Sequence, residues 1–227
     1  MKVPDPPIPQ PNSQALPPGT VVGEFTIERV LGSGVSGITY LAKDRRLERQ
    51  VVVKENLPVP FAYRDTQSLT VLPRHTEGVE AESFAWSLKN FEKGAAMRAS
   101  LDHPGIVSVL RCFEAFGTTF FVMPFVAGTA MDEQIKGRQE RGIPFSEEAL
   151  QAALLRILEA LEYLHARGIY HGDIKPGNIL ITESGEPVLI DFGSARQRLS
   201  ERSLALIESP GYTPFEQLQS RGKIGPR

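Results

Sequence analysis

The chain has 227 residues, of which 41% are hydrophobic, enough for the core of one large domain or two small ones. Its 25 Lys and Arg nearly balance its 27 Asp and Glu, so the net charge of −2 gives no bulk field to recruit nucleic acid or an anionic membrane. The single cysteine, Cys112, excludes an internal disulfide and fits a reducing compartment; we expect it to be a buried apolar residue.

Neither a charged segment followed by an apolar one nor an apolar run of membrane-spanning length is found, so we expect a cytoplasmic protein. Residues 4–18 are dense in proline, which favours an extended segment. We therefore expect residues 1–23 to form a flexible leader and residues 24–227 to form the folded domain. A role of the leader as a ligand for an adaptor domain is the less favoured alternative.

Short strands begin at Glu24. Residues 24–31 and 37–44 alternate apolar and polar side chains, and residues 49–56 form a short apolar run, which together predict an antiparallel meander. The loop between the first two strands holds glycines that let a backbone approach a phosphate chain: Gly32, Gly34 and Gly37. A dinucleotide-binding fold would need a helix after this loop, but a strand follows.

Residues 57–83 hold three prolines and little periodicity, so we expect an irregular insertion there. The pattern then predicts a helix over 80–101, a hairpin over 107–126 that turns at Gly117 and Thr118, and a long amphipathic helix that ends at Gly168. Ser146 is the expected N-cap of that last helix.

The strongest motif is the segment 170–178, YHGDIKPGN, between a helix and a short strand. It is followed by Asp191, Phe192 and Gly193 after an apolar run. An acidic residue, a lysine two positions later and an asparagine three after that can gather a base, a cation and a metal ligand in one loop.

Together these motifs resemble the protein-kinase signature: a Gly-rich loop, the strand lysine Lys54, a catalytic loop and Asp-Phe-Gly, in that order. The pair Lys175-Pro176 and the insertion make the chain similar to bacterial Ser/Thr kinases. The resemblance covers residues 24–227. It implies an α+β, bilobal fold, with an antiparallel-sheet N-lobe over about 24–123 and a mainly helical C-lobe, incomplete at its C-terminal end, over about 127–227.

The resemblance also implies ATP and Mg²⁺ as cofactors and gives individual residues roles. Asp173 would accept or orient the proton of the substrate hydroxyl, Lys175 would neutralise the transferring phosphoryl group, and Asn178 and Asp191 would hold Mg²⁺. Lys54 would bind the phosphates of ATP. The rest of the nucleotide site would comprise Gly32, Ser33, Gly34, Gly37, Thr39, Val52, Met123, Phe125, Val126 and Leu180.

Several positions depart from the family pattern. Gly94 stands where the family has a helix glutamate that pairs with the strand lysine, and Glu92 points roughly 200° round the helix from it. Arg98 replaces a usually apolar residue. Gly172 replaces the arginine before the catalytic Asp, so activation-loop phosphorylation should not be the main switch. In a chain extended to the full C-lobe, Gly94→Glu is expected to raise phosphoryl transfer, provided that Arg98 does not divert the new carboxylate by pairing with it.

The activation segment would run from Asp191 to Glu216, with Ser209, Pro210 and Tyr212 in a loop that resembles the substrate loop of Ser/Thr kinases. The expected function is ATP-dependent phosphoryl transfer to Ser or Thr of a protein substrate. The alternative is a nucleotide-binding pseudokinase that serves as a scaffold or regulator, which Gly94, Gly172 and the incomplete C-lobe favour. A small-molecule phosphotransferase is a third, less favoured reading.

Overall fold

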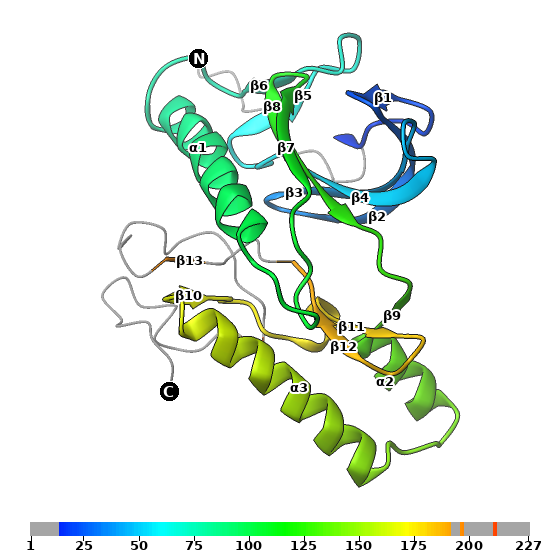
Figure 1. The fold of residues 1–227 in the computed structure, drawn as a ribbon. Helices are drawn as coiled ribbons and strands as arrows, with labels where there is room; N and C mark the ends of the chain where they lie inside the picture. Colours follow the sequence, from blue (N-terminus) through cyan, green and yellow to red (C-terminus); the bar gives the residue numbers. More distant parts are fainter. Residues whose placement is uncertain (1–13, 192–195, 198–210, 213–227) are drawn as a thin grey trace. The chain divides into compact units, whose positions relative to one another are not determined.

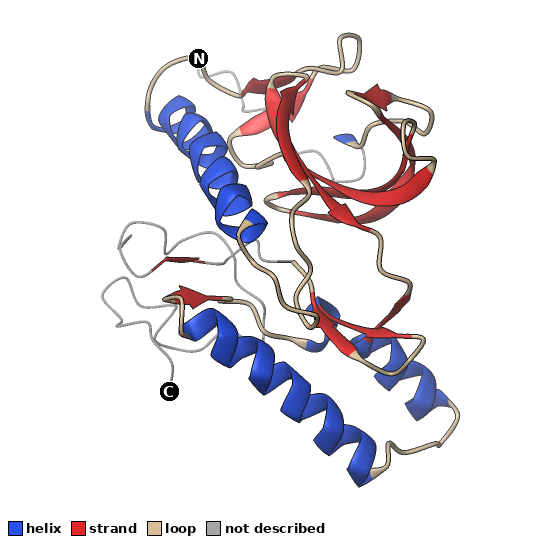
Figure 2. Ribbon diagram, in the orientation of Figure 1, coloured by secondary structure: helices blue, strands red, loops and turns tan. Residues whose placement is uncertain are grey.

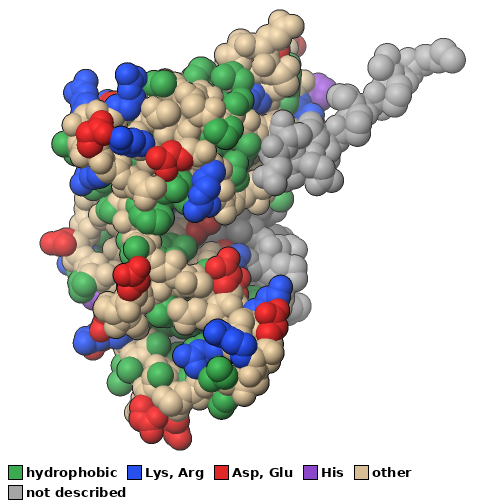
Figure 3. Space-filling view, turned by 90° about the vertical axis from the view of Figure 1, so that its right-hand side faces the viewer, with side chains coloured by type: hydrophobic (Ala, Val, Ile, Leu, Met, Phe, Trp, Pro, Cys, Tyr) green, Lys and Arg blue, Asp and Glu red, His purple; other side chains and the backbone are tan. Residues whose placement is uncertain are grey.

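The computed structural model describes residues 14–191, 196–197 and 211–212. The chain divides into two compact units, the first comprising Met1–Ala99 and Val109–Phe125 and the second Ser100–Ser108 and Val126–Arg227. Figures 1 and 2 show a curved sheet flanked by a long helix in the first unit, and helices with small sheets in the second. On the face seen in Figure 3, acidic and basic side chains are interspersed, as the near balance of charges predicts.

The first unit is built on a six-stranded antiparallel sheet of order β1-β2-β3-β4-β8-β7. Its strands are β1 (Val21–Val22), β2 (Phe25–Gly34), β3 (Gly37–Asp44), β4 (Arg49–Asn56), β7 (Arg111–Ala115) and β8 (Thr118–Pro124). The predicted meander is therefore confirmed. Alternate side chains of β3, β4 and β8 enter one core, among them Ile38, Tyr40, Val51, Val53, Phe120 and Val122.

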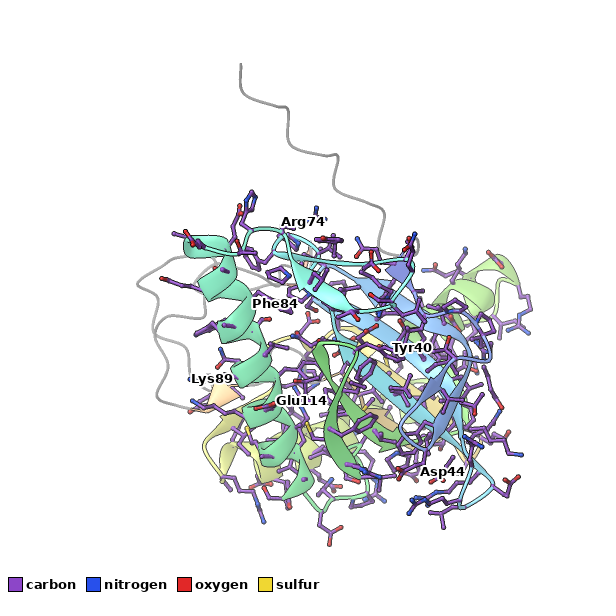
Figure 4. All side chains as sticks on the ribbon, turned by 90° about the horizontal axis from the view of Figure 1, so that it is seen from above. Tyr40, Asp44, Arg74, Phe84, Lys89 and Glu114 are labelled. Carbon is purple, nitrogen blue, oxygen red and sulfur yellow. The ribbon has the colours of Figure 1, made fainter. Side chains whose placement is uncertain are left out.

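Helix α1 (Val79–Ala99) is the only helix that the structure describes over the residues from 17 to 125. It begins with acidic residues in its first turn, which suit the positive end of the helix dipole. Phe84 joins the core cluster, whereas Lys89 is exposed to solvent; both are labelled on α1 in Figure 4. The helix thus packs one stripe of its surface against the sheet.

The expectation of a flexible leader over residues 1–23 is wrong for residues 14–23. Gln14 and Leu16 are 5% and 1% exposed, and β1 pairs with β2. The backbone N–H of Leu16 donates to the hydroxyl of Tyr40 at 3.1 Å, and that of Arg64 donates to the side-chain oxygen of Gln14 at 2.8 Å. Partners distant in the sequence therefore hold this segment, which composition alone does not reveal.

The insertion over 57–83 is not wholly irregular. It contains the antiparallel pair β5 (Ala62–Arg64) and β6 (Val71–Pro73). The N–H of Val71 donates to the carbonyl of Phe116 at 2.7 Å, which ties β6 to the turn between β7 and β8. That turn is centred on Phe116 and Gly117, both with positive φ, one residue earlier than expected.

A buried ion pair connects these elements. Arg64 bonds the carboxylate of Glu55, and both side chains are almost fully buried. Tyr40 donates its hydroxyl to the same carboxylate at 2.7 Å, and Arg64 also donates to the carbonyls of Gln14 and Leu69. Burial raises the pKa of Glu55, while Arg64 and Tyr40 oppose the shift by stabilising the carboxylate. The network joins β3, β4, β5 and the segment before β1.

The second unit contains α2 (Met131–Glu140), α3 (Glu147–His165) and the short 3₁₀ helix η2 (Pro176–Asn178). Its strands are β9 (Gly128–Ala130), β10 (Ile169–Tyr170), β11 (Ile179–Thr182), β12 (Pro187–Leu189) and β13 (Arg196–Gln197). They form a sheet of order β12-β11-β9 and a pair of β10 with β13. As expected, Ser146 caps α3 by accepting the N–H of Ala149 at 3.2 Å.

None of the described helices combines the length and apolar character needed to cross a membrane. Helix α3 nevertheless exposes a broad apolar stripe. Leu154 and Leu158, one turn apart, are each 58% exposed, and Leu150 and Leu155 extend the stripe. Contiguous exposed apolar surface of this kind promotes association.

We predict that breaking the buried ion pair destabilises the first unit. Glu55→Gln leaves Arg64 buried without its counter-charge, which should lower the free energy of unfolding by about 3–5 kcal/mol in urea titrations. Glu159→Gln removes the carboxylate of an exposed pair with Arg156. It should lower the free energy of unfolding by less than about 1 kcal/mol. Equal effects of the two substitutions would contradict the role given to burial.

A second prediction concerns the stripe on α3. The double substitution Leu154→Glu with Leu158→Lys removes apolar surface and adds a favourable pair one turn apart. It should reduce self-association in light scattering at equal protein concentration, with the helical circular dichroism signal retained. Ile157→Lys is the contrasting variant, because Ile157 is buried and a charge there should unfold the unit. Unchanged self-association of the double variant would refute the prediction.

Candidate active site

The catalytic-loop motif gathers its polar groups around Asp173 in the second unit. The Nζ of Lys175 lies 3.0 Å from Oδ2 of Asp173, and the side-chain nitrogen of Asn178 donates to the same oxygen at 2.8 Å. That nitrogen also donates to the Asp173 carbonyl at 2.8 Å. The three residues picked out by sequence spacing are thus in direct contact, and their catalytic roles remain predictions.

Local structure explains how the loop holds this arrangement. Pro176 occupies the first turn of η2, where its missing N–H costs nothing, and the N–H of Asn178 donates to the carbonyl of Lys175 at 2.9 Å. The carbonyl of Asn178 in turn accepts from the N–H of Ile190 at 2.9 Å. The loop is therefore closed on itself and fixed to the segment that leads to Asp191.

His171 is a site residue that was not identified from the sequence. It is 2% exposed; its Nδ1 accepts the N–H of Asp173 at 3.3 Å, and its Nε2 lies 3.2 Å from the carbonyl of Ile190. One ring nitrogen accepts and the other donates, as in a neutral imidazole. Gly172, next along the chain, has φ +79°, a conformation that glycine favours and arginine does not.

Asp191 and Asn178 are the candidate metal ligands. Asp191 has φ +56°, a left-handed conformation that Asp tolerates better than most residues and that often marks functional sites. The side-chain nitrogen of Asn178 is engaged by Asp173, so its side-chain oxygen is the atom suited to a cation. A carboxylate and an amide oxygen, with phosphates and water completing the shell, suit Mg²⁺. Among the described residues no cluster of three or more His, Cys, Asp or Glu could hold a metal alone.

The structure describes three of the other predicted residues of the second unit: Leu180, Val126 and Tyr212. Leu180 sits on β11, opposite Val188 of β12 and Ala130 of β9. Val126 lies two positions before the start of β9 and is partly buried. Tyr212 is exposed. The predictions for Phe192, Gly193, Ser209, Pro210 and Glu216 lie outside the described residues.

The glycine loop of the first unit is a tight hairpin between β2 and β3. Gly34 pairs with Gly37, and Ser33 pairs with Ile38. A Cβ on Gly37 would lie 2.0 Å from the carbonyl oxygen of Glu55, so packing demands glycine there. Gly32 and Gly34 have open space where a side chain would project, so packing inside the unit does not explain them. That open space suits close approach of a ligand.

One face of the sheet carries four of the predicted nucleotide residues of the first unit (Thr39, Val52, Lys54 and Met123), together with Phe121. Lys54 pairs with Thr39 on one side and with Phe121 on the other, and Val52 pairs with Met123. Because side chains alternate along strands and cross-strand partners share a face, these five residues lie on the face opposite the core. Lys54 is 7% exposed on this face, and Phe125, beyond the end of β8, is exposed.

Helix α1 covers part of the same face. The ring of Phe91 packs on the ring of Phe121 with centroids 4.7 Å apart, and the guanidinium of Arg98 lies 5.0 Å from that ring. A Cβ on Gly94 would lie 3.4 Å from a terminal nitrogen of Arg98. Arg98, not a carboxylate, therefore occupies the space beside position 94.

Glu92 lies on a different flank of the helix. Its carboxylate lies 3.5 Å from the hydroxyl of Thr119 on β8, whereas Ser87, on the other flank, accepts from Asn56 on β4 at 3.1 Å. Partial desolvation and then the Glu92 carboxylate raise the pKa of the Cys112 thiol on β7. Cys112 is exposed, contrary to expectation, because β7 is the edge strand of the sheet.

Residues 25–226 match the protein kinase domain family. Serine/threonine-protein kinase PknA of Nostoc sp. is 30% identical over 213 residues, which cover 87% of this chain and 33% of that protein. Serine/threonine-protein kinase PknF of Mycobacterium tuberculosis is 35% identical over 184 residues, which cover 79% of this chain and 34% of that protein. The chain thus spans about a third of the length of these relatives.

A solved structure described as the apo form of PpkA-294 is similar with a TM-score of 0.72 and 34% identity, covering 80% of this chain and 62% of the other. The expected kinase-like fold and the resemblance to bacterial Ser/Thr kinases are confirmed. The glycine hairpin, Lys54 on its sheet face and the loop around Asp173 are the parts of this chain that match the family's motifs, and the chain belongs to the protein kinase family.

Proposed function

We propose that this chain catalyses transfer of the γ-phosphoryl group of ATP to a Ser or Thr hydroxyl of a protein substrate. The contact of Lys175 and Asn178 with the carboxylate of Asp173 is the observation that carries the proposal. The names of the relatives, all serine/threonine-protein kinases, support the choice of substrate class. A cytoplasmic location is part of the proposal, supported by the lone cysteine.

In this proposal Asp173 orients the attacking hydroxyl and receives its proton. Its carboxylate is held from two sides, so it is preorganised before substrate arrives. Lys175 is within reach of the same point and would shift to the oxygens of the transferring phosphoryl group, whose charge it offsets. His171 fixes the backbone of Asp173 and is a positioning residue.

The nucleotide would use the face of the first unit that carries Lys54. Lys54 would bind phosphate oxygens, while Val52 and Met123 offer apolar surface to adenine. The open space above Gly32 and Gly34 allows the hairpin to approach the phosphates. From the second unit, Asn178 and Asp191 would hold Mg²⁺, which neutralises charge on the phosphates when bound.

We predict that Asp173→Asn separates chemistry from binding. The substitution keeps the size of the side chain but removes the proton acceptor, so phosphoryl transfer to a generic protein substrate should fall about 10²- to 10⁴-fold. ATP affinity should stay within about twofold, because no binding charge contact is assigned to this residue. Asp102→Asn is the matched control, since Asp102 is exposed in the same unit. Binding of ATP without transfer in the unmodified protein would favour the pseudokinase alternative.

Asp191→Asn tests the metal assignment. The loss of one negative ligand should remove most of the increase in ATP affinity that Mg²⁺ produces, a change of about tenfold or more in titration calorimetry. The melting temperature without nucleotide should change little. An unmodified protein that binds ATP equally well with and without Mg²⁺ would count against the assignment of Asn178 and Asp191.

A further inference from the structure

Asp132 places a carboxylate beside the catalytic loop of the second unit. It is the second residue of α2, and its side chain is exposed. Its Oδ2 and Oδ1 lie 3.1 and 3.9 Å from the position that a Cβ on Gly177 would take. Gly177 is the middle residue of η2. The carboxylate therefore lies against the backbone of the loop that carries Lys175 and Asn178.

This carboxylate has room to bind a cation. Its Oδ1 accepts the backbone N–H of Glu133 at 2.9 Å. Its Oδ2, the oxygen nearer to Gly177, accepts no hydrogen bond from the residues that the structure describes. Lys136, one turn later on α2, is placed to pair with Asp132 along the helix, but within the described part of the chain the two form no ion pair.

The helix itself accounts for a charge at Asp132 but not for its contact with the loop. Acidic residues in a first turn offset the helix dipole, and both Asp132 and Glu133 do so. That effect needs no second element. Helix α2 nevertheless packs on η2, and this packing sets Asp132 against Gly177. The contact is a separate property, and it concerns the site of the proposed reaction.

The distance from Asp132 to Asp173 corresponds to a few residues of a bound peptide. Gly177 is followed by Asn178, whose side-chain nitrogen donates to Oδ2 of Asp173 at 2.8 Å. Standard bond lengths along this path limit the separation of the two carboxylates to about 15 Å. An extended peptide advances about 3.4 Å per residue, so a side chain within about four residues of the phosphorylated one can reach Asp132.

We infer that Asp132 is a specificity-determining residue, which selects protein substrates with a Lys or Arg within about four residues of the phosphorylated Ser or Thr. The inference rests on the proposed function, because that function assigns the acceptor hydroxyl to Asp173. The cationic side chain pairs with Oδ2 of Asp132 while Asp173 orients the hydroxyl. Such a pair contributes equally to the bound substrate and the transition state, so the selection appears in KM and not in kcat.

The test uses the whole chain and Ser peptides in an alanine background, each with one Arg at a position from about four residues before to about four after the acceptor. One position should raise kcat/KM about fivefold over the all-alanine peptide, the upper range for an exposed ion pair, through a lower KM. Asp132→Asn should remove this gain. Asp132→Lys should reverse it, so that Glu at the same position is preferred to Arg.

Glu140→Lys is the matched control. Glu140 is exposed at the other end of α2, about 12 Å along the helix from Asp132. The variant makes the same change of charge in the same helix, and it should keep the preference for Arg. Equal effects of the two Lys variants would show that the preference follows the charge of the whole chain, and the role of Asp132 would be refuted.

Two other results would overturn the inference. The first is phosphorylation of every peptide with equal kcat/KM by the unmodified chain; the proposed function then stands without this specificity. The second is a loss in Asp132→Asn that is the same for Arg and all-alanine peptides, which indicates a structural role beside Gly177. If the unmodified chain phosphorylates neither a peptide nor a generic protein substrate, the proposed function itself fails, and the inference fails with it.

Discussion

The buried pair of Glu55 and Arg64 determines which side chains of β4 face the core. Side chains alternate along a strand, so Glu55 pointing inward directs Lys54 to the opposite face. A slip of one residue would exchange the two and place a lysine in the core. The carbonyl of Glu55 also lies where a side chain on Gly37 would be, so the same residue sets the base of the glycine hairpin.

In the second unit, the backbone N–H and carbonyl of Ile190 fix the position of the catalytic loop. Its N–H donates to the carbonyl of Asn178, and its carbonyl faces the ring of His171, which in turn accepts the N–H of Asp173. A single residue of the chain thus ties both ends of the catalytic loop. Asp191 follows directly, so its backbone starts from a point already fixed to that loop. Backbone groups thus position the catalytic loop in the second unit, whereas a buried ion pair fixes the direction of Lys54 in the first.

Features set by short-range pattern could be predicted from the sequence. The meander depends on alternation within each strand, the start of α3 on Ser146, and the contacts of Asp173 on residues at most five positions away. Features that depend on distant partners could not. Gln14 is buried because Arg64, fifty positions later, needs its oxygens, and the short β5 and β6 lack enough residues to show a period.

The burial of Arg98 could not be predicted from the sequence either, because it depends on a residue of another element. An arginine near a helix C-terminus ordinarily indicates a solvated face. Arg98 is buried with its guanidinium against an aromatic ring of another element and beside the backbone at Gly94. His171 was not identified from the sequence for a similar reason. It holds the loop through hydrogen bonds to backbone atoms and has no reactive role that a motif would mark.

The folded part of the first unit begins before the segment that matches the family. The family match starts at residue 25, but the core includes Leu16 and Val22, and Arg64 binds both the side chain and the carbonyl of Gln14. A protein cut at the family boundary would keep every recognised motif while depriving a buried guanidinium of an acceptor and the Tyr40 hydroxyl of its donor. The unit that folds and the unit that homology delimits are thus different lengths of chain, and the difference lies in residues that precede the matched segment yet supply part of the core.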